Sequence, residues 1–286
     1  MSAIATQALN GIALGVMLFF IASGLSVVWG LMRVMNMAHG AMFLLGGFVA
    51  VTVQAASKNF LLAAVAGLAA AALLGWVVQA LFLRTLMGNE FRQVMLTLGL
   101  AFVVSDAILW VFGGMPRAVR PPAFLSTSIA VGSFVYPTYR LGLIALGLAA
   151  AAAIYLLWTK SSWGAVLRAC VDDQAIAATQ GINVGRVFSI VFVIAAALAG
   201  AAASLAGPIL GVYIGLDFEM LLMAIVVVII GGMGSLEGAF VGALLVGLID
   251  SFSKAYIPDF SYFTVFAPVI VVLLLRPRGL FGRGGS

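Results

Sequence analysis

One long polar segment interrupts the apolar runs of this chain: Lys160-Ser-Ser-Trp-Gly-Ala-Val-Leu-Arg168-Ala-Cys170-Val-Asp172-Asp173-Gln-Ala-Ile-Ala-Ala-Thr-Gln-Gly181-Ile-Asn-Val-Gly-Arg186. Ser162 belongs to the residue types that cap helix N-termini. Gly181 is the residue type that most readily ends a helix, because it adopts positive φ without steric cost. The segment therefore predicts a short helix between Ser162 and Gly181.

The helix predicted here has one apolar face and one polar face. Its apolar residues recur at spacings of three and four: Leu167, Cys170, Val171, Ala175 and Ala178. Arg168 and Asp172 lie four residues apart on another face, where an ion pair contributes about 0.2–0.5 kcal/mol. Two interpretations follow from this pattern alone: a solvated connector, or a docking helix that lies along a membrane surface and receives a soluble partner.

The composition of the chain is that of an integral membrane protein. Hydrophobic residues make up 64% of the 286 residues and charged residues 8%, whereas about 25% of a soluble domain is charged. At about 20 apolar residues per span, the length accommodates eight or nine spans and one sizeable loop. We therefore expect residues 1–286 to form a single all-α domain, a polytopic membrane helical bundle with about 8–9 transmembrane segments.

Uncharged runs broken by charges or turn residues define the predicted segments. They are Ala8–Gly30, Ala38–Ala56, Phe60–Leu83, Val94–Phe112, Leu141–Thr159, Val187–Ala206, Glu219–Ile230, Gly238–Ile249 and Tyr262–Leu275. The two short segments on either side of the glycine cluster 231–234 are compatible with two thin spans or with one discontinuous element. Prolines and β-forming residues in Met115–Tyr139 predict an external loop.

Lysines and arginines set the predicted orientation, because cytoplasmic loops carry an excess of both. If all nine segments cross, one side holds the polar segment together with Arg33, Arg84, Arg92, Lys160, Arg168, Arg186, Arg276, Arg278 and Arg283. The other side holds Lys58, Arg117, Arg120, Arg140 and Lys254. This bias predicts an external N-terminus and a cytoplasmic C-terminus.

Three further motifs accompany the polar segment. They are Asn36-Met-Ala-His39-Gly40-Ala, Gly231-Gly232-Met-Gly234-Ser235-Leu-Glu237-Gly238-Ala and Arg276-Pro277-Arg278-Gly279-Leu280. The polar segment itself contains Ser-Trp-Gly, Arg-Ala-Cys, a pair of Asp and Gly-Ile-Asn. In this order the motifs resemble the permease subunits of branched-chain amino acid ABC importers, and the resemblance covers nearly the whole chain.

The resemblance implies a multi-pass protein of the bacterial inner membrane that translocates branched-chain or other small amino acids and is not itself an enzyme. The implied partners are cytoplasmic ABC ATPase subunits, a second permease subunit, identical or different, a periplasmic solute-binding protein and membrane lipid. Segment 160–186 is then the cytoplasmic coupling loop, with Arg168, Asp172, Asp173 and Gly181 as coupling residues. The loop 115–139 is either a plain connector or part of the surface on which the binding protein docks.

Two of the motifs predict broken or half-helices inside the membrane. A half-helix that starts near Asn36 presents free N–H groups and the positive end of its dipole, which suits an anionic or zwitterionic substrate. Glycine clusters such as 231–234 are tolerated at membrane depth where protein or a water-filled cavity covers the backbone. His39-Gly-Ala-Met and Glu237-Gly-Ala-Phe suggest corresponding points of an internal repeat. The predicted substrate pathway comprises Asn36, His39, Gly40, Gly232, Ser235 and Glu237.

Several functions require residues that this sequence lacks. None of the lysines stands in the Gly-Lys-Ser/Thr pattern of a phosphate-binding loop, so the chain is not the ATPase. One histidine and one cysteine offer neither a metal cluster nor a catalytic triad, and no cofactor is expected. The net charge of +5 lies at loops without a basic run, which argues against nucleic-acid binding.

Two other transport functions remain compatible with the sequence. A permease for urea or short amides has the same architecture and similar motifs. A secondary transporter driven by an ion gradient needs ionisable groups near the membrane midplane, for which Asp106 and Asp250 are the candidates. That second function leaves the polar segment without a purpose. Asp217 and Glu219 are expected at the membrane interface as ordinary charges.

Overall fold

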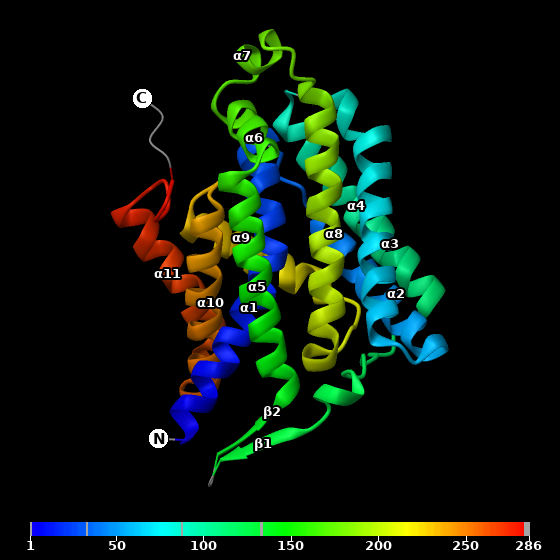
Figure 1. Cartoon of the computed structure of the whole chain (residues 1–286), viewed down its shortest axis with the longest axis vertical. Helices are drawn as coiled ribbons and strands as arrows, with labels where there is room; N and C mark the ends of the chain where they lie inside the picture. The colour runs from blue at the N-terminus through cyan, green and yellow to red at the C-terminus, as the bar shows by residue number, and fades with distance from the viewer. Residues whose placement is uncertain (1, 33, 87, 132–133, 283–286) are drawn as a thin grey trace.

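The computed structural model describes residues 2–32, 34–86, 88–131 and 134–282, and it is an elongated helical bundle with one short β-hairpin (Figure 1). The N-terminus and the hairpin lie at one end, which we call the hairpin end. Helices α6 and α7 lie at the opposite end, which we call the α7 end. The hairpin consists of β1 (Ser128–Val131) and β2 (Phe134–Pro137), in which Ser128 pairs with Pro137 in antiparallel register.

Within the described residues, seven helices are long and apolar enough to cross a membrane. They are α1 (Ser2–Met32), α2 (His39–Ser57), α3 (Phe60–Leu81), α4 (Glu90–Phe112), α5 (Thr138–Lys160), α8 (Val184–Leu210) and α10 (Leu236–Tyr256). Two shorter apolar helices are α9 (Leu216–Gly231) and α11 (Ser261–Leu275). Each of the nine predicted segments thus coincides with a helix, and the all-α bundle is confirmed.

The sequence left open whether the segments around the glycine cluster were two spans or one element. They are two separate helices: α9 has 16 residues and α10 has 21, and the turn at Gly232–Ser235 joins them. The two helices pack against each other and against α1. The sequence underestimated the length of α10, because Asp250 and Lys254 interrupt its apolar run. In the structure these two charges form an ion pair within the helix at 2.9 Å.

Helix α2 begins inside the bundle. Its first residue, His39, places Nε2 3.0 Å from the carbonyl oxygen of Ile21, which lies 11 residues before the last residue of α1, Met32. At 1.5 Å per residue, the His39 ring therefore contacts α1 at a level about 16 Å along its axis from Met32, so the chain has turned back into the bundle between Met32 and His39. This segment is a re-entrant connection, and the half-helix expected near Asn36 is present as α2.

Helix α9 begins inside the bundle as well, beside the start of α2. After α8 ends at Leu210, Val212 forms a β-bridge with Arg117 and the chain turns back towards the interior. A Cβ atom added to Gly40 would lie 2.3 Å from the carbonyl oxygen of Asp217, so the first turns of α2 and α9 are in direct contact. From this meeting point α2 runs to the hairpin end and α9 to the α7 end.

Helices α1–α4 and helices α8–α11 form two sets that are related by an inverted repeat. In the first set α2 packs against α3 and α4, and in the second α9 packs against α10 and α11. Helix α1 of the first set crosses to pack on α9 and α10, and α8 crosses in the same way to α2 and α3. Because α1 runs away from the hairpin end and α8 runs towards it, the sets have opposite orientations, as in many transporters.

The inverted repeat corrects the internal correspondence expected from the sequence. His39 opens α2, whose counterpart is α9, whereas Glu237 lies in the first turn of α10, whose counterpart is α3. The prediction that His39-Gly-Ala-Met and Glu237-Gly-Ala-Phe are equivalent is therefore wrong. The two stretches look alike because Gly-Ala pairs are common at close helix contacts throughout this chain.

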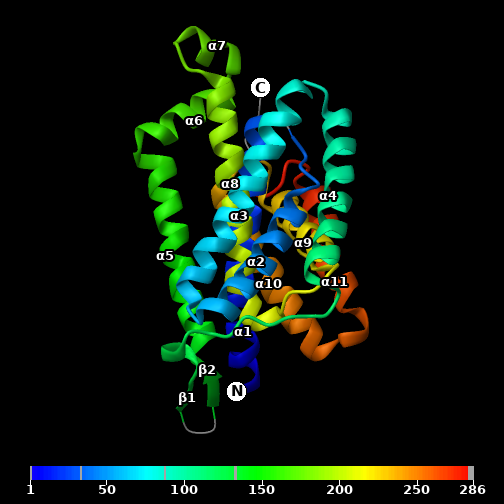
Figure 2. The ribbon, with the colours of Figure 1, turned by 90° about the vertical axis from the view of Figure 1, so that its right-hand side faces the viewer.

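The core of the bundle surrounds α1, and the outer helices expose much of their surface. Side chains from Val16 to Leu25 on α1 are almost all buried, and α2, α8, α9 and α10 supply most of the residues around them. Helix α5 stands at one side of the bundle and α4 at the opposite side (Figure 2). Both are largely exposed apolar helices, which is the pattern of surfaces that face lipid or other membrane proteins.

The single helix predicted between Ser162 and Gly181 is wrong, because the structure forms two. They are α6 (Ser162–Asp172) and α7 (Gln174–Thr179), and Asp173 separates them in an extended conformation with φ −155°. Oδ1 of Asp173 accepts from the N–H groups of Ala175 at 2.8 Å and Ile176 at 3.0 Å, so this residue caps α7. The cap of α6 is Ser161, whose Oγ accepts from Gly164 N–H at 3.0 Å.

Candidate functional site

The start of α2 is assembled from backbone and short polar side chains. Oδ1 of Asn36 accepts from the N–H of Ala38 at 3.0 Å, and Oγ1 of Thr97 on α4 accepts from the N–H of Met37 at 3.1 Å. The N-cap residue of α2, Ala38, has no side chain that can cap the helix. Asn36 therefore orders the re-entrant segment rather than capping α2, and the positive end of the α2 dipole points into the bundle.

The start of α9 carries a buried carboxylate that the sequence placed elsewhere. Asp217 is 2% exposed, so the expectation of an ordinary charge at the rim is wrong. Its Oδ2 accepts from Ser105 Oγ of α4 at 2.5 Å, and its Oδ1 accepts from the N–H of Gly215 at 3.1 Å. A turn glycine followed within two residues by an acid at the start of an apolar run is the signal that would have revealed this helix start.

Together the two helix starts form a polar centre inside an apolar bundle. Asn36, His39 and Asp217 are each at most 2% exposed, and Gly40 brings α2 against the backbone at Asp217. Each of the two helix N-termini carries partial positive charge. The two helix starts and the carboxyl group of Asp217 thus share one buried polar centre.

The second half of the predicted pathway lies elsewhere, at the α7 end. Oγ of Ser235 caps α10 by accepting from the N–H of Gly238 at 3.0 Å, and Glu237 is exposed in the first turn. Gly232 adopts φ +101°, and a Cβ atom there would lie 2.6 Å from the backbone nitrogen of Gly282. The structure therefore brings Asn36, His39 and Gly40 together but separates them from Gly232, Ser235 and Glu237 by the length of α9.

The predicted coupling residues lie on the projecting loop that contains α6 and α7. The guanidinium of Arg168 donates to the carbonyl oxygen of Trp158 at the end of α5. Gly181 adopts φ +83° where the segment leaves α7, as expected of a helix-ending glycine. Cys170 of α6 is fully buried, and burial raises the pKa of its thiol.

The two aspartates of this loop face a cavity of about 560 Å³. Asp172 and Asp173 line it together with Glu90 and Gln93 from the start of α4 and Met32 from the end of α1. Gln93 is 2% exposed, and its Oε1 lacks a hydrogen-bond partner within the described structure. The cavity thus lies between the α6–α7 loop and α4, the helix whose Thr97 bonds the re-entrant segment.

Asp106 and Asp250, the acids considered for an ion relay, do not meet. Asp106 is exposed on α4, whereas Asp250 is 3% exposed on α10 and forms an ion pair with Lys254 at 2.9 Å. Asp250 also lines a cavity of about 290 Å³ with Arg140 and Glu219 at the hairpin end. Their separation on different helices gives no continuous path of carboxylates through the bundle.

Comparison with known proteins identifies the family. A family model described as the permease component of branched-chain amino acid transport systems matches residues 7–275. The chain belongs to this family. As a member of the branched-chain amino acid permease family, it is a membrane-spanning permease component of an ABC transporter and not an enzyme, as its sequence motifs indicated.

Several relatives of this permease resemble it over almost their whole length. The high-affinity branched-chain amino acid transport system permease protein LivH of Escherichia coli K12 is 29% identical over 296 residues, which cover 97% of this chain and 95% of the relative. LivH of Salmonella typhimurium is also 29% identical with the same coverage. The permease protein BraD of Pseudomonas aeruginosa is 27% identical over 292 residues, again with coverage of 97% and 95%. No solved structure matches the chain.

Proposed function

We propose that this permease carries branched-chain and similar small amino acids across the bacterial inner membrane. The observation that carries the proposal is the meeting of the first turns of α2 and α9 inside the bundle, with the buried carboxyl group of Asp217 in the first turn of α9. An amino acid has a carboxylate, which suits a helix N-terminus, and an ammonium group, which suits a carboxylate. The names of the relatives, which refer to high-affinity branched-chain amino acid transport, support the aliphatic substrate class.

The proposed pathway has a central part and an inner part. Asn36, His39 and Gly40 form the central part, where their backbone and side chains shape the start of α2. Gly232, Ser235 and Glu237 form the inner part, at the α7 end of α9. Because α9 begins beside Gly40 and ends at Gly231, a movement of this helix changes both parts at once.

Coupling to ATP hydrolysis is proposed to act through α6 and α7, with Arg168, Asp172, Asp173 and Gly181 as the coupling residues. The ATPase that binds this loop would displace Asp172 and Asp173, which share a cavity with the start of α4. Helix α4 in turn holds Met37 through Thr97 and Asp217 through Ser105. These contacts give a physical route from the loop to both half-helix starts.

The remaining partners and the orientation belong to the same proposal. The α7 end and the C-terminus face the cytoplasm and its ATPase subunits, while the hairpin end faces the periplasmic solute-binding protein. A second permease subunit, identical or different, completes the transporter. The exposed faces of α4 and α11 are apolar enough to pack against such a subunit or against membrane lipid.

The test is uptake by proteoliposomes that contain the permease, its ATPase and its binding protein. We expect Arg168→Glu to reduce both leucine uptake and stimulated ATP hydrolysis at least tenfold, because it reverses a charge on the coupling loop, while the protein still inserts. Arg84→Glu, an equal change at an exposed residue outside the loop, serves as the control. Normal uptake by Arg168→Glu would contradict the coupling role.

The same proteoliposomes separate the other transport functions. Leucine uptake that continues without ATP and collapses with the ion gradient would indicate a secondary transporter. Uptake of urea in preference to leucine would indicate an amide permease. The ion pair of Asp250 with Lys254 leaves Asp250 poorly suited to an ion relay, so we expect neither result.

A further inference from the structure

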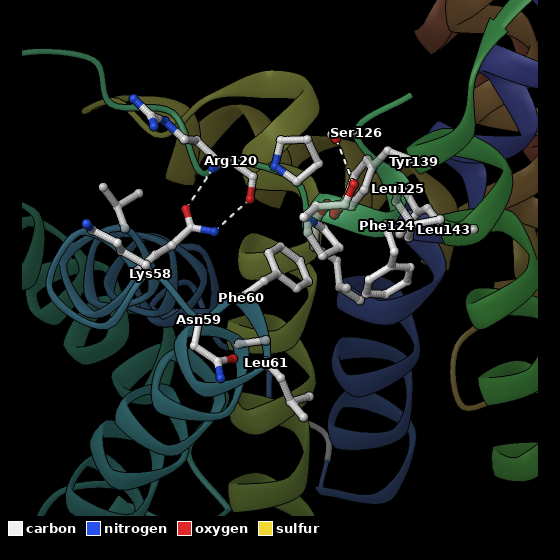
Figure 3. Close-up of a pocket in the computed structure, with 18 of the residues that line it drawn as sticks. Lys58, Asn59, Phe60, Leu61, Arg120, Phe124, Leu125, Ser126, Tyr139 and Leu143 are labelled. Atoms are coloured by element: carbon white, nitrogen blue, oxygen red, sulfur yellow. Dashed lines mark hydrogen bonds between the residues drawn. The ribbon is translucent and has the colours of Figure 1, made fainter. Parts of the chain in front are cut away.

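A cavity of about 1640 Å³ opens between α3 and α5 at the hairpin end, and α8 forms its inner wall (Figure 3). Its deeper part is apolar along three helices, with Leu61, Ala64, Val65 and Leu68 of α3, Leu143 and Leu146 of α5, and Ala201 and Leu205 of α8. Leu61 is 72% exposed and Val65 54% exposed, so this apolar wall lies open at the side of the bundle. The cavity is larger than the roughly 300–1,000 Å³ typical of small-molecule pockets.

One edge of the cavity is basic. Lys58, the C-cap residue of α2, adopts φ 55°, and Arg120 lies on the loop that passes beside it. Gln54 fixes that loop, because its Nε2 donates to the carbonyl oxygen of Arg120 at 2.6 Å and its Oε1 accepts from the N–H of the same residue at 2.7 Å. Figure 3 shows Lys58 and Arg120 on one side, Tyr139 and Leu143 on the other, and Phe60 between them.

The charge at this edge is uncompensated within the described part of the chain. No aspartate or glutamate lines the cavity, and no carboxylate there pairs with Lys58 or Arg120. Between the basic edge and the apolar wall, the rings of Phe60 and Tyr139 meet edge to face with centroids 6.1 Å apart. The cavity thus presents cations, then aromatic rings, then aliphatic side chains. Membrane proteins use the same order, with cations at the headgroups, aromatic rings at the interface and aliphatic side chains along the acyl chains.

We propose that this cavity binds a phospholipid with an anionic headgroup. The phosphate lies at Lys58 and Arg120, and an acyl chain occupies the slot between α3 and α5 above Ala201. Cations on a membrane surface select anionic over zwitterionic lipids, and a second cation adds to that selection. The bound lipid fills the gap beside α8 and so supports the helix that crosses to α2 and α3.

Other occupants fit the cavity less well. A free amino acid would fill a small part of it and would meet cations without a carboxylate partner for its ammonium group. A soluble binding protein could reach the basic edge but not the apolar wall that descends along α3 and α5. The lipid site does not depend on which solute the permease carries.

The experiment measures lipid adducts on the full-length chain by native mass spectrometry after exchange from nanodiscs. The probes are phosphatidylglycerol, phosphatidylcholine with the same acyl chains, and glycerol 3-phosphate, which has the anionic head without a tail. We expect one phosphatidylglycerol to be retained and phosphatidylcholine to be lost. Lys58→Glu with Arg120→Glu should reduce phosphatidylglycerol retention at least tenfold. The control pair Arg84→Glu with Arg92→Glu, which makes the same charge change at exposed residues of the α7 end, should not.

A second pair of variants tests the acyl chain. Ala64→Phe fills the slot, so we expect it to release phosphatidylglycerol, whereas Ala107→Phe on the exposed face of α4 should retain it. Circular dichroism and thermal melting of each variant show whether it is folded. The proposal is overturned if both charge-reversal pairs retain lipid equally, if glycerol 3-phosphate binds as tightly as the lipid, or if Ala64→Phe changes nothing. Loss of binding-protein association without loss of lipid would instead assign the basic edge to protein docking.

Discussion

At the scale of single residues, burial decides which polar groups build the centre. Asp217 and Glu219 look alike in the sequence, two acids at the start of one apolar run. The structure buries Asp217 against Ser105 and leaves Glu219 half-buried, where it accepts from the hydroxyl of Tyr213 at 2.7 Å. Sequence analysis could select Asn36, His39 and Gly40, because they stand in a recognisable motif. It could not pair Ser105 with Asp217, because these two residues lie 112 positions apart in the chain.

Gly40 allows the two half-helices to meet, which a substitution can test. A Cβ atom there would lie 2.3 Å from the carbonyl oxygen of Asp217, and neither backbone can yield cheaply inside the core. We expect Gly40→Ala to destabilise the protein by about 1–3 kcal/mol and to abolish uptake. Thermal melting in detergent and uptake in proteoliposomes measure the two effects.

The matched control is Gly99→Ala on α4. No atom lies within 4 Å of the Cβ position at Gly99, which is an exposed residue within the helix. Alanine there should be neutral or should stabilise by about 0.5–1 kcal/mol, because glycine is the poorer helix former. Equal melting temperatures for Gly40→Ala and Gly99→Ala would show that the contact between α2 and α9 is looser than the structure indicates.

At the scale of elements, apolar runs predicted the membrane helices, and local capping escaped prediction. The sequence placed a helix in each of nine segments, because a 20-residue apolar run has few other ways to satisfy its backbone in a membrane. It joined α6 and α7 into one helix, because alternating Ala and polar residues continue through Asp173 without glycine or proline. The side chain of Asp173 ends that continuity by bonding two N–H groups.

Asp173 therefore has a structural role that can be separated from its charge. Asp173→Ala removes the cap, and we expect it to destabilise α7 by about 0.5–2 kcal/mol, seen as faster amide hydrogen exchange at residues 174–179. Asp173→Asn keeps a capping oxygen and removes the charge. If Asp173→Asn preserves slow exchange yet lowers stimulated ATP hydrolysis, the carboxylate also acts in coupling. Exchange in Asp173→Ala that is as slow as in the unchanged protein would refute the capping role.

At the scale of the whole molecule, the inverted repeat accounts for the two half-helices as one feature. Each set of four helices begins with a long helix that turns back into the bundle, and the two returns approach the centre from opposite ends. The sequence indicated a repeat from paired glycine motifs but aligned the wrong helices. Which helices correspond in such a repeat is shown by contacts such as those of α1 with α10 and of α8 with α3. No local sequence pattern encodes these contacts.

The orientation of the bundle gives the last prediction, which uses cysteine labelling. Ser128→Cys lies exposed in β1 at the hairpin end, and Ala178→Cys lies exposed in α7. With the hairpin end outside, a membrane-impermeant maleimide should label Ser128→Cys in intact spheroplasts, and it should label Ala178→Cys only after lysis.

The native Cys170 should add little background, because it is fully buried and burial raises the pKa of its thiol. Since maleimide reacts with the thiolate, Cys170 should remain slower than Ala178→Cys at pH 7 and react appreciably only as the pH rises above the ordinary thiol pKa of about 8.5. Labelling of Ala178→Cys in intact spheroplasts would reverse the orientation and place the proposed coupling loop on the side without ATP.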